Sequence, residues 1–154
     1  MTATIELLNT QHQDVLARLT HVEAGIMAAD GFDLAPFAAY LEDEVAHHFA
    51  IEEHALFPLL ARHLSQEQGP LAVMNAEHAA FRQLLAGLTS ALRAGDRDAQ
   101  RTHAAELVQL LRAHIAKEDQ VLFPMAARLL SAGERDEVDR RAAVLTNSPA
   151  SSEA

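Results

Sequence analysis

The sequence predicts an all-α protein, an up-down-up-down bundle of four long helices followed by a short extra C-terminal helix. The main observation is an internal repeat. The segment 48–58, His-Phe-Ala-Ile-Glu-Glu-His-Ala-Leu-Phe-Pro, recurs 66 residues later at 114–124 with His, Glu, the next acid, Leu, Phe and Pro in register. The same shift of 66 places 9–12 on 75–78. The chain therefore consists of two copies of one helical hairpin.

The second observation is the spacing of apolar residues, which follows the period of an amphipathic helix over long stretches. In the first stretch Ile5, Leu8, Val15 and Leu19 fall on one face. The third observation is the punctuation between the stretches by Gly and Pro, as at Gly69-Pro70. Together they predict helices at about 3–28, 34–63, 70–94 and 97–130, and a short one at about 131–145.

The ends of these helices carry recognisable signals. Asp33 is suited to cap the second helix, and Asp96 or Asp98 to start the fourth. Gly95 is expected to end the third helix in a left-handed conformation. Ser131-Ala132-Gly133-Glu134 has the spacing of a capping box.

Two prolines fall inside predicted helices, Pro58 in the second and Pro124 in the fourth. A proline in a helix removes one backbone hydrogen bond and clashes with the preceding turn. We therefore expect a kink at each of them, at the same place in both copies.

Composition sets the class of protein. The 154 residues are 49% hydrophobic and 22% charged, which suits one folded domain over residues 1–145. Residues 146–154 are small and polar, and we expect a disordered tail there. The net charge of −10 argues against nucleic-acid and anionic-membrane partners. A monomer or weak homo-oligomer is expected.

The chain has no cysteine, so any metal must be held by nitrogen and oxygen ligands. The N-terminus lacks the pattern of a signal peptide, and no apolar run is as long as a membrane span. A cytoplasmic location is the resulting expectation.

Six residues are predicted to lie in one layer of the bundle. His12 precedes the end of its helix by 16 residues, and His48 and Glu52 follow the start of the next helix by 14 and 18. At ~1.5 Å per residue these positions lie at heights of roughly 24, 21 and 27 Å from the shared turn. In the second copy the same count brings His78 to the level of His114 and Glu118.

This layer has the composition of a metal site. Each His-x-x-x-Glu pair has i, i+4 spacing, so both side chains point inward from one helix face. Four imidazoles and two carboxylates suit two Fe or Mn ions, and Zn also fits this donor set. A single His on an apolar face is more often a satisfied core residue than a ligand. The duplicated spacing at one height favours the metal site over that explanation.

These motifs resemble those of the hemerythrin-like (HHE cation-binding) family, in which a lone His and a His-x-x-x-Glu are repeated. The resemblance covers about residues 3–130. It implies a four-helix bundle with two non-haem irons, bridged by two carboxylates and an oxo or hydroxo group. It also implies six metal ligands, with Glu52 and Glu118 bridging: His12, His48, Glu52, His78, His114 and Glu118.

The sequence departs from the family's oxygen carriers at one ligand. Those proteins have a second His four residues after the one on the third helix, and here that residue is Arg82. Water, Glu44, Tyr40 or His47 could complete the coordination, or the irons could keep more open positions. Open positions favour binding and activating small molecules over reversible oxygen carriage.

Several functions fit this prediction. The first is binding of dioxygen, nitric oxide or peroxide for sensing or for oxidative and nitrosative stress defence. The second is a di-iron enzyme with catalase-like or nitric-oxide-reducing activity, for which the sequence singles out no catalytic residue beyond the metal ligands. The third is an iron-handling module without redox turnover.

Overall fold

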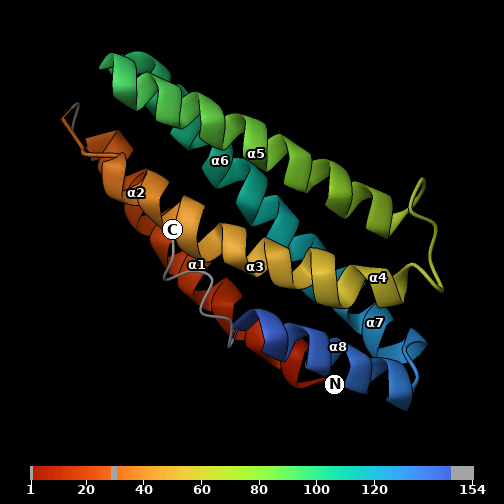
Figure 1. Ribbon diagram of the computed structural model, residues 1–154. Coiled ribbons are helices and arrows are strands. Elements are labelled where there is room, and N and C mark those ends of the chain that lie inside the picture. The colour runs from red at the N-terminus through yellow and green to blue at the C-terminus, as the bar shows by residue number, and fades with distance from the viewer. Residues whose placement is uncertain (1, 29–30, 147–154) are drawn as a thin grey trace.

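The computed structural model describes residues 2–28 and 31–146, and within these ranges all regular secondary structure is helical. The long helices lie side by side along the molecule (Figure 1). The predicted helical bundle is confirmed. The predicted tail at 146–154 lies outside the described residues except for Thr146, which ends the last helix.

The helices begin and end close to their predicted residues. The first hairpin is α1 (Ala3–Ala28) followed by a continuous helical run of five segments that ends at Leu60. The second hairpin is α5 (Pro70–Ala94) followed by a run that ends at Leu129. The first run comprises α2 (Ala35–Tyr40), η1 (Leu41–Val45), α3 (Ala46–Ile51), η2 (Glu52–Leu56) and α4 (Phe57–Leu60). The second run comprises α6 (Arg97–Lys117), η3 (Glu118–Leu122) and α7 (Phe123–Leu129), and α8 (Ala132–Thr146) follows it.

The two helix-interior prolines are accommodated by π-helical segments. A proline has no N–H to donate, and the helix widens by one residue just before each of them. Phe57 N–H donates to the carbonyl of Glu52, and Phe123 N–H donates to that of Glu118. These two π segments, η2 and η3, thus begin at the glutamate of a His-x-x-x-Glu pair, whereas η1 begins at Leu41. A π-bulge is one of the recognised responses of a helix to such a break, and it recurs in both copies.

Most of the predicted caps are present. The amide of Ala99 donates to Asp96 Oδ1 at 3.1 Å, and Gly95 has a φ of 69° at the end of α5. Ser131 and Glu134 exchange hydrogen bonds between side chain and backbone at 3.1 and 2.9 Å, as a capping box requires. Asp33 accepts from the amide of Ala35, although α2 begins directly after Leu34.

The apolar core is divided by the predicted polar layer. One cluster contains Leu8, Leu56 and Phe123 together with residues of α8. The other contains Val15, Phe81 and other buried residues toward the opposite ends of the helices. On α1, His12 falls between Leu8 and Val15, at the boundary of the two clusters.

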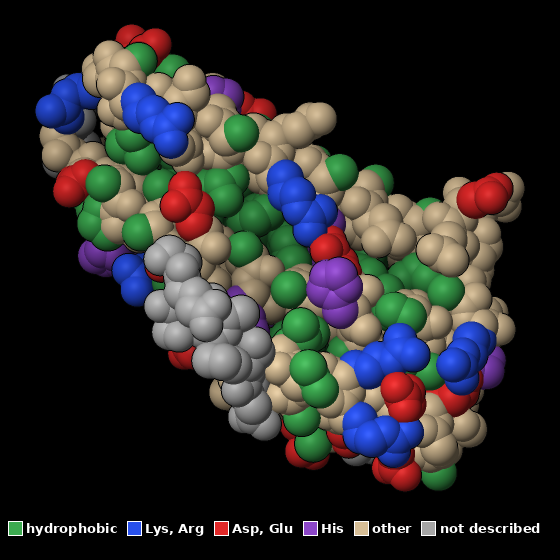
Figure 2. Space-filling model, in the orientation of Figure 1, with side chains coloured by type: hydrophobic (Ala, Val, Ile, Leu, Met, Phe, Trp, Pro, Cys, Tyr) green, Lys and Arg blue, Asp and Glu red, His purple; other side chains and the backbone are tan. Residues whose placement is uncertain are grey.

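Helix α8 packs on α1, α3 and η2, as the blue ribbon in Figure 1 shows beside the start of α1. On the face drawn in Figure 2, Lys and Arg side chains over α8 lie next to Asp and Glu. Within α8, Arg140 and Arg141 both pair with Glu137. Among the described helices, none is long and apolar enough to cross a membrane.

Candidate metal centre

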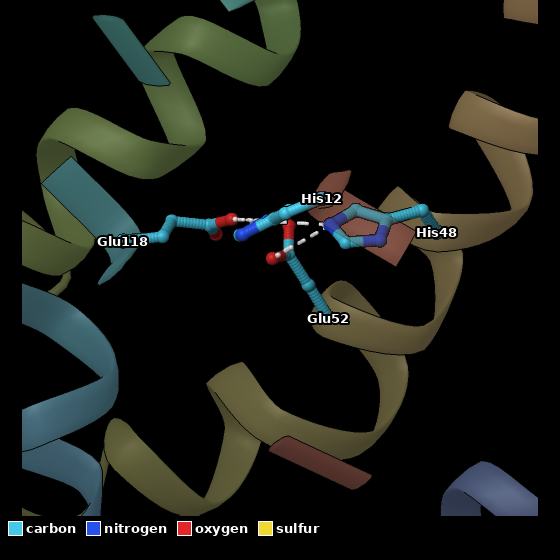
Figure 3. A group of neighbouring side chains, drawn as sticks. All are labelled: His12, His48, Glu52 and Glu118. Atoms are coloured by element: carbon cyan, nitrogen blue, oxygen red, sulfur yellow. Dashed lines mark hydrogen bonds and ion pairs between the residues drawn. The ribbon is translucent and has the colours of Figure 1, made fainter. Parts of the chain in front are cut away.

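The structure brings the six predicted residues together in the interior of the bundle. Each of them has at most 3% of its surface exposed, and both glutamates are fully buried. Figure 3 shows His12, His48, Glu52 and Glu118 pointing toward one another from α1, α3, η2 and η3. The i, i+4 spacing and the π segments aim the His and Glu of each pair at the same centre.

The six side chains form two overlapping groups that share both glutamates. In the first group Glu52 and Glu118 join His12 and His48, and in the second they join His78 and His114. Within each group one ligand atom per residue lies within 4.8 Å of all the others. Two cations held here would share Glu52 and Glu118 as common carboxylate ligands.

The contacts between imidazoles and carboxylates cross between the hairpins. His12 Nε2 lies 3.0 Å from Glu118 Oε1, and His78 Nε2 lies 3.0 Å from Glu52 Oε1. Within each i, i+4 pair the distances are longer, 3.3 Å from His48 Nε2 to Glu52 Oε2 and 3.5 Å from His114 Nε2 to Glu118 Oε2.

Three buried atoms at this centre have no hydrogen-bond partner among the described residues: Glu52 Oε2, Glu118 Oε2 and His114 Nε2. Buried polar atoms are nearly always satisfied in folded proteins. Here the unsatisfied atoms are two carboxylate oxygens and an imidazole nitrogen, which are the donor types that divalent iron, manganese and zinc accept. The residues present therefore fit a pair of cations.

Each of the four imidazoles is also held from behind through Nδ1. The distances are 2.8 Å from His12 to Asp119 Oδ1 and 2.6 Å from His78 to Glu53 Oε2. An acceptor on Nδ1 fixes the tautomer and leaves the Nε2 lone pair facing the centre. The remaining two pairs are His48 with Gln11 Oε1 at 2.8 Å and His114 with Glu77 Oε1 at 2.9 Å.

The carboxylates change the protonation of two imidazoles in the metal-free chain. Burial lowers the pKa of His48, but the charge of Glu52 and the nearby carboxylate of Glu118 raise it to about 9 overall. Burial also lowers the pKa of His114, but the nearby carboxylates of Glu118, Glu52 and Glu77 raise it to about 11 overall. Burial raises the pKa of Glu52, but the His48 charge and the neighbouring Glu118 and His114 bring it well below its ordinary value.

These shifts predict how pH affects the metal-free protein. Because the pKa values of His48 and His114 are raised from 6.5 to about 9 and 11, their contribution to stability is complete below pH 6.5 and declines as pH rises through those values. We expect the melting temperature of the metal-free chain to fall between pH 6.5 and 10. Thermal melts monitored by circular dichroism would measure this.

The stabilisation that bound metal adds to the folded state should depend on pH in the opposite way. A cation binds neutral imidazole and must displace these protons, so its stabilising effect grows as pH rises over the same window. A metal-free melting temperature that rises from pH 6.5 to 9 would contradict the protonation states assigned to His48 and His114.

The sequence did not identify the residues that hold the imidazoles from behind. Glu44, a candidate for completing the coordination, is exposed, and Gln11, Glu53, Glu77 and Asp119 hold the rings. A signal was available, because the shift of 66 places 11 on 77 and 53 on 119. His47, also considered as a ligand, is exposed and belongs to neither group.

Arg82, which stands where the oxygen carriers have a His, supports the centre indirectly. Its guanidinium donates to both carboxylate oxygens of Glu53 at 2.7 Å, and Glu53 in turn holds His78. Tyr40 and Glu44, the other residues considered for completing the coordination, line a pocket beside His48 but lie outside both groups.

Helices that enclose two overlapping groups of His and Glu define a cation-binding bundle, and comparison with known families agrees. Residues 3–126 match the model of the Hemerythrin HHE cation binding domain. The chain belongs to this family. No solved structure matches the chain.

The chain is also similar to curated bacterial proteins named iron-sulfur cluster repair protein YtfE. The protein from Enterobacter sp. (strain 638) is 35% identical over 102 residues, which are 60% of this chain and 46% of that protein. The protein from Escherichia coli O1:K1 / APEC is 33% identical over the same length and the same shares. The chain thus spans about half the length of the curated relatives it matches.

Proposed function

We propose that this chain is a cytoplasmic, non-haem di-iron protein that binds a small ligand, dioxygen, nitric oxide or peroxide, for sensing or for oxidative and nitrosative stress defence. The observation that carries the proposal is the pair of buried groups sharing Glu52 and Glu118. His12 and His48 would hold one iron, and His78 and His114 the other. Iron in such a site supplies redox electrons and open coordination positions for a small ligand.

The chain's own residues support this function in three ways. The carboxylates of Glu52 and Glu118 offset part of the cation charge, and they are the only Asp, Glu, Lys or Arg side chains buried among the described residues. Nδ1 acceptors orient all four imidazoles toward the centre. Two His per cation leave more positions open than a site with three His would.

The apolar surroundings limit the access of water to the site. Phe49 stacks on His78 with ring centroids 3.8 Å apart, and Phe123 stacks on His12 at 5.5 Å. Leu122 and Leu56 are fully buried in the adjoining cluster. Such walls fix the ring planes and favour small, weakly hydrated ligands over large polar ones.

The first experiment is to measure metal content and the visible spectrum of the purified protein without oxygen, and then to add dioxygen, peroxide or nitric oxide in turn. We expect about two Fe per chain, as the two groups require, and a spectrum that responds to at least one of the three ligands. A reversible response would indicate binding, and sustained peroxide or nitric oxide consumption would indicate an enzyme. Zn in place of Fe, with no response, would refute the proposal.

A second candidate is iron handling in the repair of iron-sulfur clusters, which the names of the relatives favour. It requires that iron leaves the centre for an acceptor. Transfer of iron from the loaded protein to a cluster-free iron-sulfur protein would support it. Retention of all the iron under these conditions would favour ligand binding.

A further inference from the structure

The two cation positions differ in the residues that hold their imidazoles from behind. At the position of His78 and His114 both acceptors are carboxylates, Glu53 at 2.6 Å and Glu77 at 2.9 Å. At the position of His12 and His48, one acceptor is Asp119 and the other is the amide of Gln11, each at 2.8 Å. We call the position of His12 and His48 the first position and that of His78 and His114 the second. The imidazoles of the second position are thus held by one carboxylate more than those of the first.

Gln11 and Glu77 occupy equivalent places in the two copies, since 77 − 11 = 66. Each precedes a ligand His by one residue and contacts the His of the neighbouring helix. A carboxylate can only accept, so Glu77 obliges His114 to carry its proton on Nδ1 and to offer the Nε2 lone pair. An amide can present either oxygen or NH2, so Gln11 enforces this tautomer less strictly and adds no negative charge.

The carboxylates of the second position are themselves held by cations. Arg82 donates to Glu53, and Lys117 donates to Glu77. Each of these carboxylates therefore contacts an imidazole on one side and a Lys or Arg side chain on the other. The Lys117 side chain is 47% exposed, so solvent screens its charge more than that of Glu77, which is 15% exposed. Arg82 and Lys117 thus offset the negative charge of Glu53 and Glu77 in part, so the difference between the two positions rests on the hydrogen-bond acceptors that hold the imidazoles.

The first position also lies beside a pocket with a polar lining. A pocket of about 630 Å³ has His48 and Gln11 in its wall, together with Asp14, Arg18 and Glu44. In the other copy the shift of 66 replaces these three polar residues by Ala80, Leu84 and Leu110.

Those replacements make the equivalent place in the second copy apolar. Leu84 and Leu110 pack against the apolar cluster that contains Phe81. Water and chelators thus have an approach beside His48 that the apolar residues do not offer beside His114.

We propose that the two cation positions are unequal, that the position of His12 and His48 binds its cation more weakly and releases it first, and that Gln11 sets the difference as a positioning residue. This inference rests on the proposed function in one respect, that both positions bind a cation.

The test uses Co²⁺, whose visible absorption reports its ligands, loaded anaerobically into the whole metal-free chain and then removed by an excess of chelator. We expect release from the unmodified protein in two phases of equal amplitude. His12→Ala should retain the slow phase alone, and His78→Ala the fast phase alone. These variants assign each phase to a position.

Exchanging the side chains of Gln11 and Glu77, one at a time, then tests whether they cause the difference in release rate. Since loss of such an acceptor typically weakens metal affinity 10–100-fold, Gln11→Glu should slow the fast phase by roughly tenfold. Glu77→Gln should accelerate the slow phase by a similar factor. Lys117→Gln is the control for the ion pair and should change the slow phase less than Glu77→Gln does.

Release of both cations in a single phase from the unmodified protein would overturn the inference, as would a Gln11→Glu effect confined to the slow phase. A chain that binds fewer than two Co²⁺ at saturation would instead refute the proposed function. If circular dichroism shows that one of the two exchange variants does not fold, the release kinetics of the unmodified protein and of the other exchange variant still test the inference.

Discussion

Replacing Glu118 by alanine is expected to remove both cations from the protein. The carboxylate belongs to both groups of potential ligands, so its loss takes one donor from each position at once. It also leaves His12 Nε2 without its contact at 3.0 Å. Metal content after reconstitution and desalting would measure the effect.

The matched control is Glu106→Ala, which removes an exposed glutamate of the same helical run. This variant should keep the full metal content and the spectrum of the unmodified protein. A Glu118→Ala protein that still retains two cations per chain would show that Glu118 is not a shared ligand.

Removing the metal is expected to lower the melting temperature strongly. A cation present at 1,000 times its dissociation constant stabilises the folded state by about 4 kcal/mol. In a domain of this size each kcal/mol shifts the melting temperature by roughly 2–4 °C, so each position should contribute roughly 10 °C. Calorimetry of the loaded protein with and without a chelator would measure the shift.

The stabilisation has a specific structural cause. Glu52 and Glu118 are fully buried, and each has one oxygen without a hydrogen-bond partner among the described residues, which a bound cation would satisfy. The Glu118→Ala variant serves as the control, because a chelator should leave its melting temperature unchanged. Equal melting temperatures of the loaded and chelated unmodified protein would contradict a structural role for the metal.

The sequence by itself determined the helices and the repeat. Helical periodicity and the caps at Asp96, Gly95 and Ser131 are local signals, so α5 begins and ends at the predicted residues and α6 begins at its predicted residue. The effect of the prolines was predicted only in part. Pro58 and Pro124 follow π segments, and a single proline does not dictate how its helix absorbs the missing hydrogen bond.

The sequence also determined that six residues would meet. His48 and Glu52 share a helix face because of their i, i+4 spacing, and the rise per residue sets the height of each residue. In a bundle of straight antiparallel helices, equal distance from the turn is enough to place His12 at the same level. These are properties of helix geometry alone, and for that reason they could be predicted.

Only the tertiary structure decided which residues contact each other across the hairpins. His12 lies against Glu118 and Asp119, more than one hundred residues away, because α1 packs beside α6. The rotation of each helix about its axis and the rotamer of each side chain select these contacts, and neither follows from spacing. For the same reason, Gln11 and Glu77 became recognisable as supports of the imidazoles, and the pocket beside His48 became visible, only once the helices were packed.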